Sequence, residues 1–177
     1  APPLAAGTLD MKSATYRCCG APDVIRIERV AKPQPAQDEV LIKIEAASVN
    51  PLDWHYLHGK PYIMRMDAGI GAPKDTSIGV DFSGVVEAVG SGVTRFKPGD
   101  AVFGAANGSF AEYATVRESR NIVRKPDNLS FAQAAAIPVA AITALQALRD
   151  QGQVQPGQSV LINGASGGVG TFAVQIA

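Results

Sequence analysis

The feature that most limits how this chain can fold is an apolar segment that runs into a cluster of glycines near residue 177. Residues 158–163 have the composition of a strand, residues 164–170 read G-A-S-G-G-V-G, and residues 171–177 suit a helix. A strand that enters a helix through such a turn is typical of the first unit of a dinucleotide-binding domain, because backbone N–H groups at a helix N-terminus can hold a pyrophosphate. We therefore predict a strand, a phosphate-binding turn and a helix after Gly170.

The glycine spacing is G-x-x-G-x-x-G and departs from the usual G-x-G-x-x-G pattern, because Ala165 takes the second glycine position. Gly167 and Gly168 would let the backbone approach phosphates, and Gly170 would let the helix pack close to the strand. The cofactor-binding residues expected at this turn are Ala165, Ser166, Gly167, Gly168, Val169 and Gly170. An ordinary strand-turn-helix link, whose glycines only allow tight packing, is the alternative. The residue that would separate NAD from NADP is expected about 20 positions further on, past residue 177.

Composition describes a globular chain and argues against two classes of partner. Hydrophobic residues make up 46% of the 177 residues and charged residues 18%, which allows one buried domain plus a fragment, or one large domain. The 16 basic and 16 acidic residues cancel, so charge gives no reason to expect binding to nucleic acid or to an anionic membrane surface. No apolar run has the length of a membrane span. We expect neither nucleic-acid nor membrane partners.

The only two cysteines, Cys18 and Cys19, are adjacent. Neighbours on an extended segment point to opposite faces, which suits neither a disulfide framework nor two ligands of one metal. Residues 1–10 lack a basic start and a long apolar core, so we interpret them as a disordered leader and not as a signal peptide. Both observations favour a reducing, cytoplasmic location.

Residues 11–126 consist of short strand-like runs broken by Gly, Pro and Asp, which predicts a compact antiparallel barrel. The predicted strands are 12–17, 24–30, 39–48, 78–89, 101–104, 110–116 and 121–124. After residue 128 the pattern becomes helical: Ser130 can cap a helix over 131–137, and Pro138 suits the first turn of another over 139–149. The expected organisation is a leader (1–10), a barrel domain (11–128), connecting helices (129–150) and the start of a dinucleotide-binding domain (151–177).

The order of these blocks resembles the medium-chain dehydrogenase/reductase superfamily, whose members join a GroES-like barrel to a Rossmann domain. The resemblance rests on residues 20–25, 46–53, 79–86, 97–102, 108–113 and 140–144, together with the glycine turn. It covers residues 11–177. It implies a mostly-β GroES-like barrel followed by the first strand and helix of an α/β Rossmann domain, truncated at residue 177.

Within this superfamily, the chain resembles the zinc-independent quinone oxidoreductase branch. Zinc-dependent members bind their catalytic metal with a cysteine and a Gly-His-Glu segment, which here reads Gly79, Val80 and Asp81, while the cysteines lie far upstream. The resemblance implies reduction of quinones or activated C=C bonds (enones or enals) without zinc, by NADPH, with NADH as the alternative donor. Such substrates are already electrophiles, so a pocket needs mainly to position a hydride donor and stabilise an oxyanion.

The resemblance also implies roles for individual residues. Asn50 matches a position near the nicotinamide and substrate, where its amide would donate to an oxyanion; alternatively it only closes the turn before Pro51. His55 matches a pocket tyrosine and could donate a hydrogen bond or proton; alternatively it is simply an exposed histidine. Thr143 matches a contact to the nicotinamide amide, or packs at a helix start. Asp81 lies in an apolar strand and needs an ion pair or backbone N–H donors.

Four further expectations concern the chain as a unit. The alternative function is a non-catalytic GroES-like binding or assembly module, since the barrel alone resembles the co-chaperonin fold. The full-length reductase is expected to be a homodimer, and the 177 residues alone are expected to be inactive. At the C-terminal end, an apolar patch is expected to be exposed; its members are Leu161, Ile162, Phe172, Val174 and Ile176.

Overall fold

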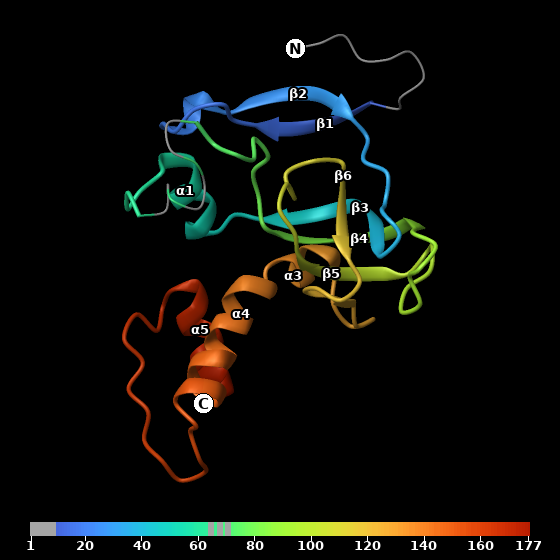
Figure 1. Cartoon of the computed structure of the whole chain (residues 1–177). Coiled ribbons are helices and arrows are strands. Elements are labelled where there is room, and N and C mark those ends of the chain that lie inside the picture. The colour runs from blue at the N-terminus through green and yellow to red at the C-terminus, as the bar shows by residue number, and fades with distance from the viewer. Residues whose placement is uncertain (1–9, 64–65, 67–68, 70–71) are drawn as a thin grey trace.

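Two antiparallel sheets form the N-terminal part of the chain, and a group of helices follows them (Figure 1). The computed structural model describes residues 10–63, 66, 69 and 72–177. One sheet pairs β1 with β2, and the other has the strand order β6-β3-β4-β5-β7. The strands are β1 (Asp10–Thr15), β2 (Arg26–Ala31), β3 (Glu39–Ser48), β4 (Asp81–Val89), β5 (Ala101–Ala105), β6 (Tyr113–Arg117) and β7 (Ile122–Arg124). All seven strands predicted up to residue 124 are present, each with both ends within three residues of the prediction.

The core of the five-stranded sheet lies around β3 and β4, which pair antiparallel with Val40 opposite Val89 and Ser48 opposite Asp81. Its buried members are Val40, Ile42, Phe82, Val86, Phe96, Val102, Val116 and Ile122. β4 is buried on both faces over its first four residues, as its apolar sequence predicts. On one side it meets the first of the connecting helices, where the Ser83 hydroxyl donates to the Phe131 carbonyl oxygen at 2.6 Å.

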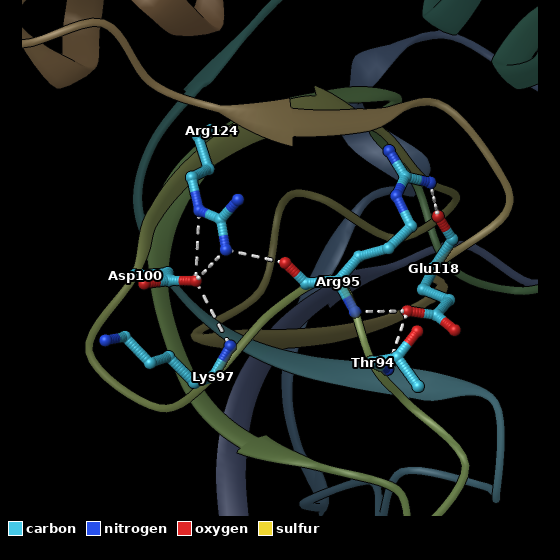
Figure 2. Close-up of polar contacts among 6 residues, drawn as sticks. All are labelled: Thr94, Arg95, Lys97, Asp100, Glu118 and Arg124. Atoms are coloured by element: carbon cyan, nitrogen blue, oxygen red, sulfur yellow. Dashed lines mark hydrogen bonds and ion pairs between the residues drawn. The ribbon is translucent and has the colours of Figure 1, made fainter.

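Charged side chains hold together the connections around β5 and β7 (Figure 2). The Asp100 carboxylate accepts hydrogen bonds from the Lys97 backbone N–H at 3.1 Å and from the Arg124 guanidinium at 3.0 Å. Arg124 also donates to the Arg95 carbonyl oxygen at 2.6 Å, and the Arg95 N–H donates to the Glu118 carboxylate at 2.9 Å. This network ties the turn before β5 to β7 and to the residue that follows β6.

Helices complete the fold: α1 (Pro51–His58), α3 (Phe131–Ala135), α4 (Pro138–Leu145) and α5 (Gly168–Ile176). A 3₁₀ turn (Pro22–Val24) and a π-helical segment (Gln146–Gln151) accompany them. Ser130 caps α3 as predicted, since its hydroxyl accepts from the Gln133 N–H at 3.2 Å. The helix predicted over 139–149 starts one residue earlier and changes to the π-helical segment after Leu145. None of the helices in the described ranges is long and apolar enough to cross a membrane.

Helix α1 is absent from the sequence prediction, which treats this region as a turn. Its start does carry a signal, because Asn50, Pro51 and Asp53 take the N-cap, N1 and N3 positions of a capping box. The Asn50 N–H donates to the Asp53 carboxylate at 2.7 Å, and Gly59 ends the helix in the left-handed conformation with φ of 58°. The helix is short and lacks an apolar period, so periodicity alone misses it.

The strand predicted over 158–163 is wrong: these residues form no ladder with any described segment. A strand needs a hydrogen-bonded neighbour, and in Figure 1 this part of the chain makes a long excursion away from both sheets. Leu161 is 96% exposed as a result, and Val174 (54%) and Ile176 (42%) are also exposed. Ile162 and Phe172 are only partly exposed, because they pack on the small cluster between α4 and α5. The predicted apolar patch is therefore present in part.

The boundary of the predicted leader also changes. Asp10 belongs to β1 and pairs with Ala31, so the ordered fold includes the last residue of the predicted leader. The rest of the predicted leader, residues 1–9, lies outside the described residues.

Candidate functional site

A cleft of about 590 Å³ separates the start of α1 from the pair of helices α4 and α5. It is mostly apolar, and its walls come from three segments distant in sequence. The first segment contributes Asn50, Pro51 and Leu52; the second contributes Val139, Ala140, Ala144, Ala147 and Leu148; the third contributes residues 160–164, Gly167, Gly168, Val169, Gly170 and Ala173. The structure therefore brings Asn50 and the glycine turn into the lining of one cleft.

The glycine turn forms a tight loop that leads into α5. Gly164 adopts φ of +73°, and the Gly167 N–H donates to the Gly164 carbonyl oxygen at 3.0 Å. A Cβ on Gly170 would lie 2.2 Å from the Gly164 oxygen and 2.6 Å from the Ala165 Cα, so only glycine fits. The close packing expected of Gly170 is present, but it is made against the turn itself and not against a strand.

Gly167 and Gly168 are exposed, and the space beside them is open. A Cβ on Gly167 would have its nearest neighbour at 3.4 Å, and one on Gly168 would have its nearest at 4.0 Å. No side chain in the described part of the chain caps α5, so its first-turn backbone N–H groups remain available at the positive end of the helix dipole. This bare corner of the cleft has the donors that a phosphate group needs. Ala165 and Ser166 lie on the turn, exposed, but do not line the cleft.

Asn50 is 9% exposed and held by contacts on both sides of its amide. Its Nδ2 donates to Asp81 Oδ2 at 3.2 Å and, at a longer 3.4 Å, to Ser48 Oγ. Its side chain also takes part in the capping box with Asp53 at the start of α1. Because a carboxylate only accepts hydrogen bonds, the amide nitrogen must face Asp81. Asn50 thus caps a helix and lines the cleft at the same time. Its amide N–H groups are directed at Asp81 and Ser48, and donation to a substrate oxyanion stays a prediction.

Asp81 is fully buried at the base of the cleft wall. Its Oδ2 accepts from the Ser48 hydroxyl of β3 and from the Asn50 amide. Both of its oxygens also accept from the Val139 N–H, at 3.1 and 3.2 Å. The sequence predicts either an ion pair or backbone N–H donors for Asp81. No ion pair involves Asp81 within the described part of the chain, and the backbone N–H of Val139 is the partner found. Burial raises the pKa of Asp81, and the hydrogen bonds from Val139, Asn50 and Ser48 oppose that rise.

Asp53 is a second buried carboxylate next to this network, with 4% exposure. Burial raises its pKa, the Asn50 N–H lowers it, and the nearby Asp81 charge raises it further. Its Oδ1 is buried without a partner among the described residues. Asp53 also borders a smaller cavity of about 200 Å³ together with Tyr16 and Tyr56, which do not line the main cleft.

His55 and Thr143 are not among the residues that line the cleft. His55 is half-buried, and its Nδ1 lies 2.7 Å from the Lys60 carbonyl oxygen, so Nδ1 carries the hydrogen and donates it there. The Thr143 hydroxyl is exposed and donates to the Val139 carbonyl oxygen one turn earlier in α4, at 2.6 Å. Helix α4 instead provides an apolar wall of the cleft through Ala140 and Ala144. The sequence analysis does not include these residues in the site, although the apolar character of residues 139–148 could have indicated them.

The residues that the resemblance matches to the Gly-His-Glu segment of zinc-dependent enzymes are Gly79, Val80 and Asp81. Within residues 10–63, 66, 69 and 72–177, no group of three or more His, Cys, Asp or Glu side chains is placed to hold a metal ion. Val80 supplies no ligand atom, and Asp81 is committed to its hydrogen bonds. Cys18 is exposed and Cys19 half-buried, in the bends that follow β1.

Comparison with known proteins places this geometry in context. The family model of the alcohol dehydrogenase GroES-like domain matches residues 36–127. The chloroplastic quinone-oxidoreductase homolog of Spinacia oleracea is 41% identical over 169 residues, which cover 89% of this chain and 49% of that protein. The 2-methylene-furan-3-one reductase of Solanum lycopersicum is 40% identical over 179 residues, or 95% of this chain and 44% of that protein.

A mycobacterial protein whose structure was solved in complex with NADPH superimposes with a TM-score of 0.80 at 32% identity. The match covers 93% of this chain and 48% of the mycobacterial one. The chain thus spans about half the length of the relatives that it matches.

Proposed function

The chain belongs to the alcohol dehydrogenase GroES-like family of the medium-chain dehydrogenase/reductase superfamily, and on this premise we propose that it is part of a zinc-independent, NADPH-dependent reductase of quinones or activated C=C bonds. One observation carries the proposal: Asn50 and the uncapped start of α5 line the same apolar cleft. The named activities of the relatives, a quinone oxidoreductase homolog and a furanone reductase, support the substrate class.

The cleft residues fit a dinucleotide. The first-turn N–H groups of α5 would bind its phosphates, and Gly167 and Gly168 leave room for them beside the backbone. Ala140, Ala144 and the other apolar residues of the α4 wall would exclude water from the rest of the molecule. Asn50 would contact it from the opposite wall. When bound, the reduced nicotinamide supplies the hydride.

Reduction without zinc agrees with the chemistry of the residues at the metal position of related enzymes. Val80 offers no ligand atom, and Asp81 accepts all of its hydrogen bonds from donors of the chain. A quinone or enone accepts hydride at carbon without a Lewis acid, provided that the developing oxyanion is stabilised. We expect that a chelator leaves the activity of the full-length protein unchanged; loss of activity that zinc alone restores would contradict this part of the proposal.

His55 and Thr143 keep their proposed roles as a proton-donating group and a cofactor contact. With Nδ1–H bonded to the Lys60 carbonyl oxygen, Nε2 is the ring nitrogen that can exchange a proton with a substrate oxygen. His55→Gln in the full-length protein should lower kcat with little change in the KM for NADPH. Thr143→Val should raise the KM for NADPH. Unchanged kinetics in either variant would assign that side chain to helix packing alone.

The proposal extends to the setting in which the protein works. We propose a small-molecule quinone or enone substrate, a cytoplasmic location and a homodimer for the full-length protein. Light scattering of the full-length protein gives the oligomeric state directly, and a monomer at micromolar concentration would contradict the dimer.

A titration of cofactor fluorescence tests cofactor binding at the turn. NADPH should bind to the 177-residue chain, and parallel titration with NADH measures the preference. Gly167→Ala keeps an allowed backbone conformation but adds a methyl group to the open side of the turn, so we expect about tenfold weaker binding, or roughly 1.4 kcal/mol. Gln175→Ala, at an exposed position of α5 outside the cleft lining, is the matched control and should bind as the wild type does. Equal affinity in both variants would refute phosphate binding at this turn.

A further inference from the structure

The Asp81 carboxylate contacts both walls of the cleft without lining it. On one side it accepts from the Asn50 amide, at the start of α1. On the other it accepts from the Val139 N–H, at the start of α4. Asn50 and Val139 both line the cleft, whereas Asp81 is fully buried behind them. We propose that Asp81 is a positioning residue that sets the distance and angle between α1 and α4, and so the shape of the cofactor cleft; this inference rests on the proposed function.

The start of α4 needs an acceptor from elsewhere in the fold. The N-cap position is Ile137, which has no side-chain acceptor, and Pro138 has no N–H. Val139 therefore carries the first N–H of α4 that requires a partner, and leaving it unsatisfied in a partly buried place would be costly. Asp81 supplies that partner from β4, 58 residues away in sequence. A helix that takes its cap from the sheet is fixed in position relative to the sheet.

The start of α1 is fixed through the direction of the Asn50 amide. Its nitrogen donates to Asp81, while its side chain also serves the capping box with Asp53. Reversing the amide would place N–H groups against the N–H groups of the first turn of α1. An asparagine at position 81 has one oxygen for the donors of both walls. With that oxygen in the place of Oδ2 it accepts from Asn50 and Val139, but its NH₂ group then takes the place of Oδ1, which lies 3.2 Å from the Val139 nitrogen. With the amide reversed, the NH₂ group faces the NH₂ group of Asn50. In either orientation an N–H group faces another N–H group, so Asp81→Asn weakens the link to one of the two helices while keeping size and shape.

Exchanging the two side chains gives the bond between positions 50 and 81 a matched donor and acceptor again. In the double variant, which combines Asn50→Asp with Asp81→Asn, the carboxylate introduced at position 50 accepts from the amide introduced at position 81. That carboxylate can also cap α1, since aspartate is a good N-cap residue. The amide oxygen introduced at position 81 still accepts from Val139, and the net charge of the chain does not change. Only a role that depends on the direction of these hydrogen bonds predicts that two disruptive changes compensate each other.

The test compares the wild type, Asp81→Asn and the exchanged double variant of the 177-residue chain by two measurements. Fluorescence titration gives the affinity for NADPH, and residual dipolar couplings of backbone amides give the orientation of α1 relative to α4. Asp38→Asn, which removes an exposed carboxylate paired with Arg117, is the matched control. We expect Asp81→Asn to weaken NADPH binding at least about tenfold, or roughly 1.4 kcal/mol, and to change the helix orientation. The double variant should bind about as tightly as the wild type and keep the original orientation.

Several results would overturn the inference. It fails if Asp81→Asn keeps the wild-type affinity and helix orientation, or if the double variant is no better than Asp81→Asn. If Asp81→Asn does not fold, the double variant decides alone, because the inference requires that it folds with α1 and α4 in their original orientation. If the wild type does not bind NADPH, the proposed function fails, whereas the dipolar couplings still decide whether Asp81 sets the two helices.

Discussion

The contact that Gly170 makes with the glycine turn gives a prediction whose size follows from the structure. An alanine Cβ at position 170 would lie 2.2 Å from the Gly164 oxygen, 2.6 Å from the Ala165 Cα and 2.8 Å from the Ala165 carbonyl carbon. An ordinary contact begins near 3.4 Å, so the turn and α5 would have to separate by 3.4 − 2.2 = 1.2 Å. All three neighbours are backbone atoms, which cannot rotate away. Overpacking of this kind costs about 1–3 kcal/mol.

Gly168→Ala is the matched control, because the same methyl group is added to the same helix. Its nearest neighbour would be the Ala140 Cβ at 4.0 Å, an ordinary distance. Alanine favours the helix by up to about 1 kcal/mol at either position, so the difference between the two variants isolates the contact. We expect Gly170→Ala to be less stable than Gly168→Ala by about 1–3 kcal/mol.

Hydrogen exchange measures this difference locally, at the amide N–H groups of α5. A difference of about 1–3 kcal/mol corresponds to protection factors lower by roughly five- to 150-fold in Gly170→Ala. Ala177, whose N–H donates to the Ala173 carbonyl oxygen, and Thr171, whose N–H donates to the Gly167 carbonyl oxygen, are suitable probes. Equal protection in the two variants would show that the turn relaxes freely, and the reasoning from close packing would then be refuted.

Three further predictions concern stability. Ser130→Ala should lower the free energy of unfolding by about 1 kcal/mol, because it removes the cap of α3, as urea denaturation can check. Asp100→Asn should destabilise the chain at pH 7 but not at pH 2. Burial acts to raise the pKa of Asp100, but the hydrogen bonds from Lys97 and Arg124 lower this pKa overall, so the stabilisation by the carboxylate is lost as pH falls. Equal effects at both pH values would contradict this. Burial raises the pKa of Asp81 above the ordinary value of 3.8, so the folded chain keeps a proton on this group at a pH where the unfolded chain has released it. The free energy of unfolding of the wild type, relative to that of Asp81→Asn, should therefore fall as pH rises above 4. A rise would contradict this.

The sequence predicts those parts of the fold whose signals are local. β3 is predicted with both ends correct, because its apolar alternation is bounded by turn residues. The cap formed by Ser130 is likewise found from the residue types alone. The strand over 158–163 fails for the opposite reason: its residue composition suits a strand, but a strand also depends on a neighbour, which the described chain does not supply.

The candidate site shows the same division. The resemblance implies that Asn50 and the glycine turn contact the same cofactor. The structure places both in the lining of one cleft, and cofactor binding stays a prediction. The sequence predicts that the buried Asp81 carboxylate has hydrogen-bond donors, because a buried charge needs them. It does not identify the Val139 N–H as the donor, because that contact depends on the fold. The positions of His55 and Thr143 depend on the direction of short helices, which residue matching does not determine.

The most direct test of the central claim is an amide NMR titration of the 177-residue chain with NADPH. The glycine amide signals are well suited, because Gly167, Gly168 and Gly170 line the cleft. The account predicts that these signals, the Val169 amide and the Asn50 side-chain amide shift together with one dissociation constant. Saturating shifts confined to other surfaces, such as the Arg95 and Arg124 network, or no shifts at millimolar NADPH, would contradict it.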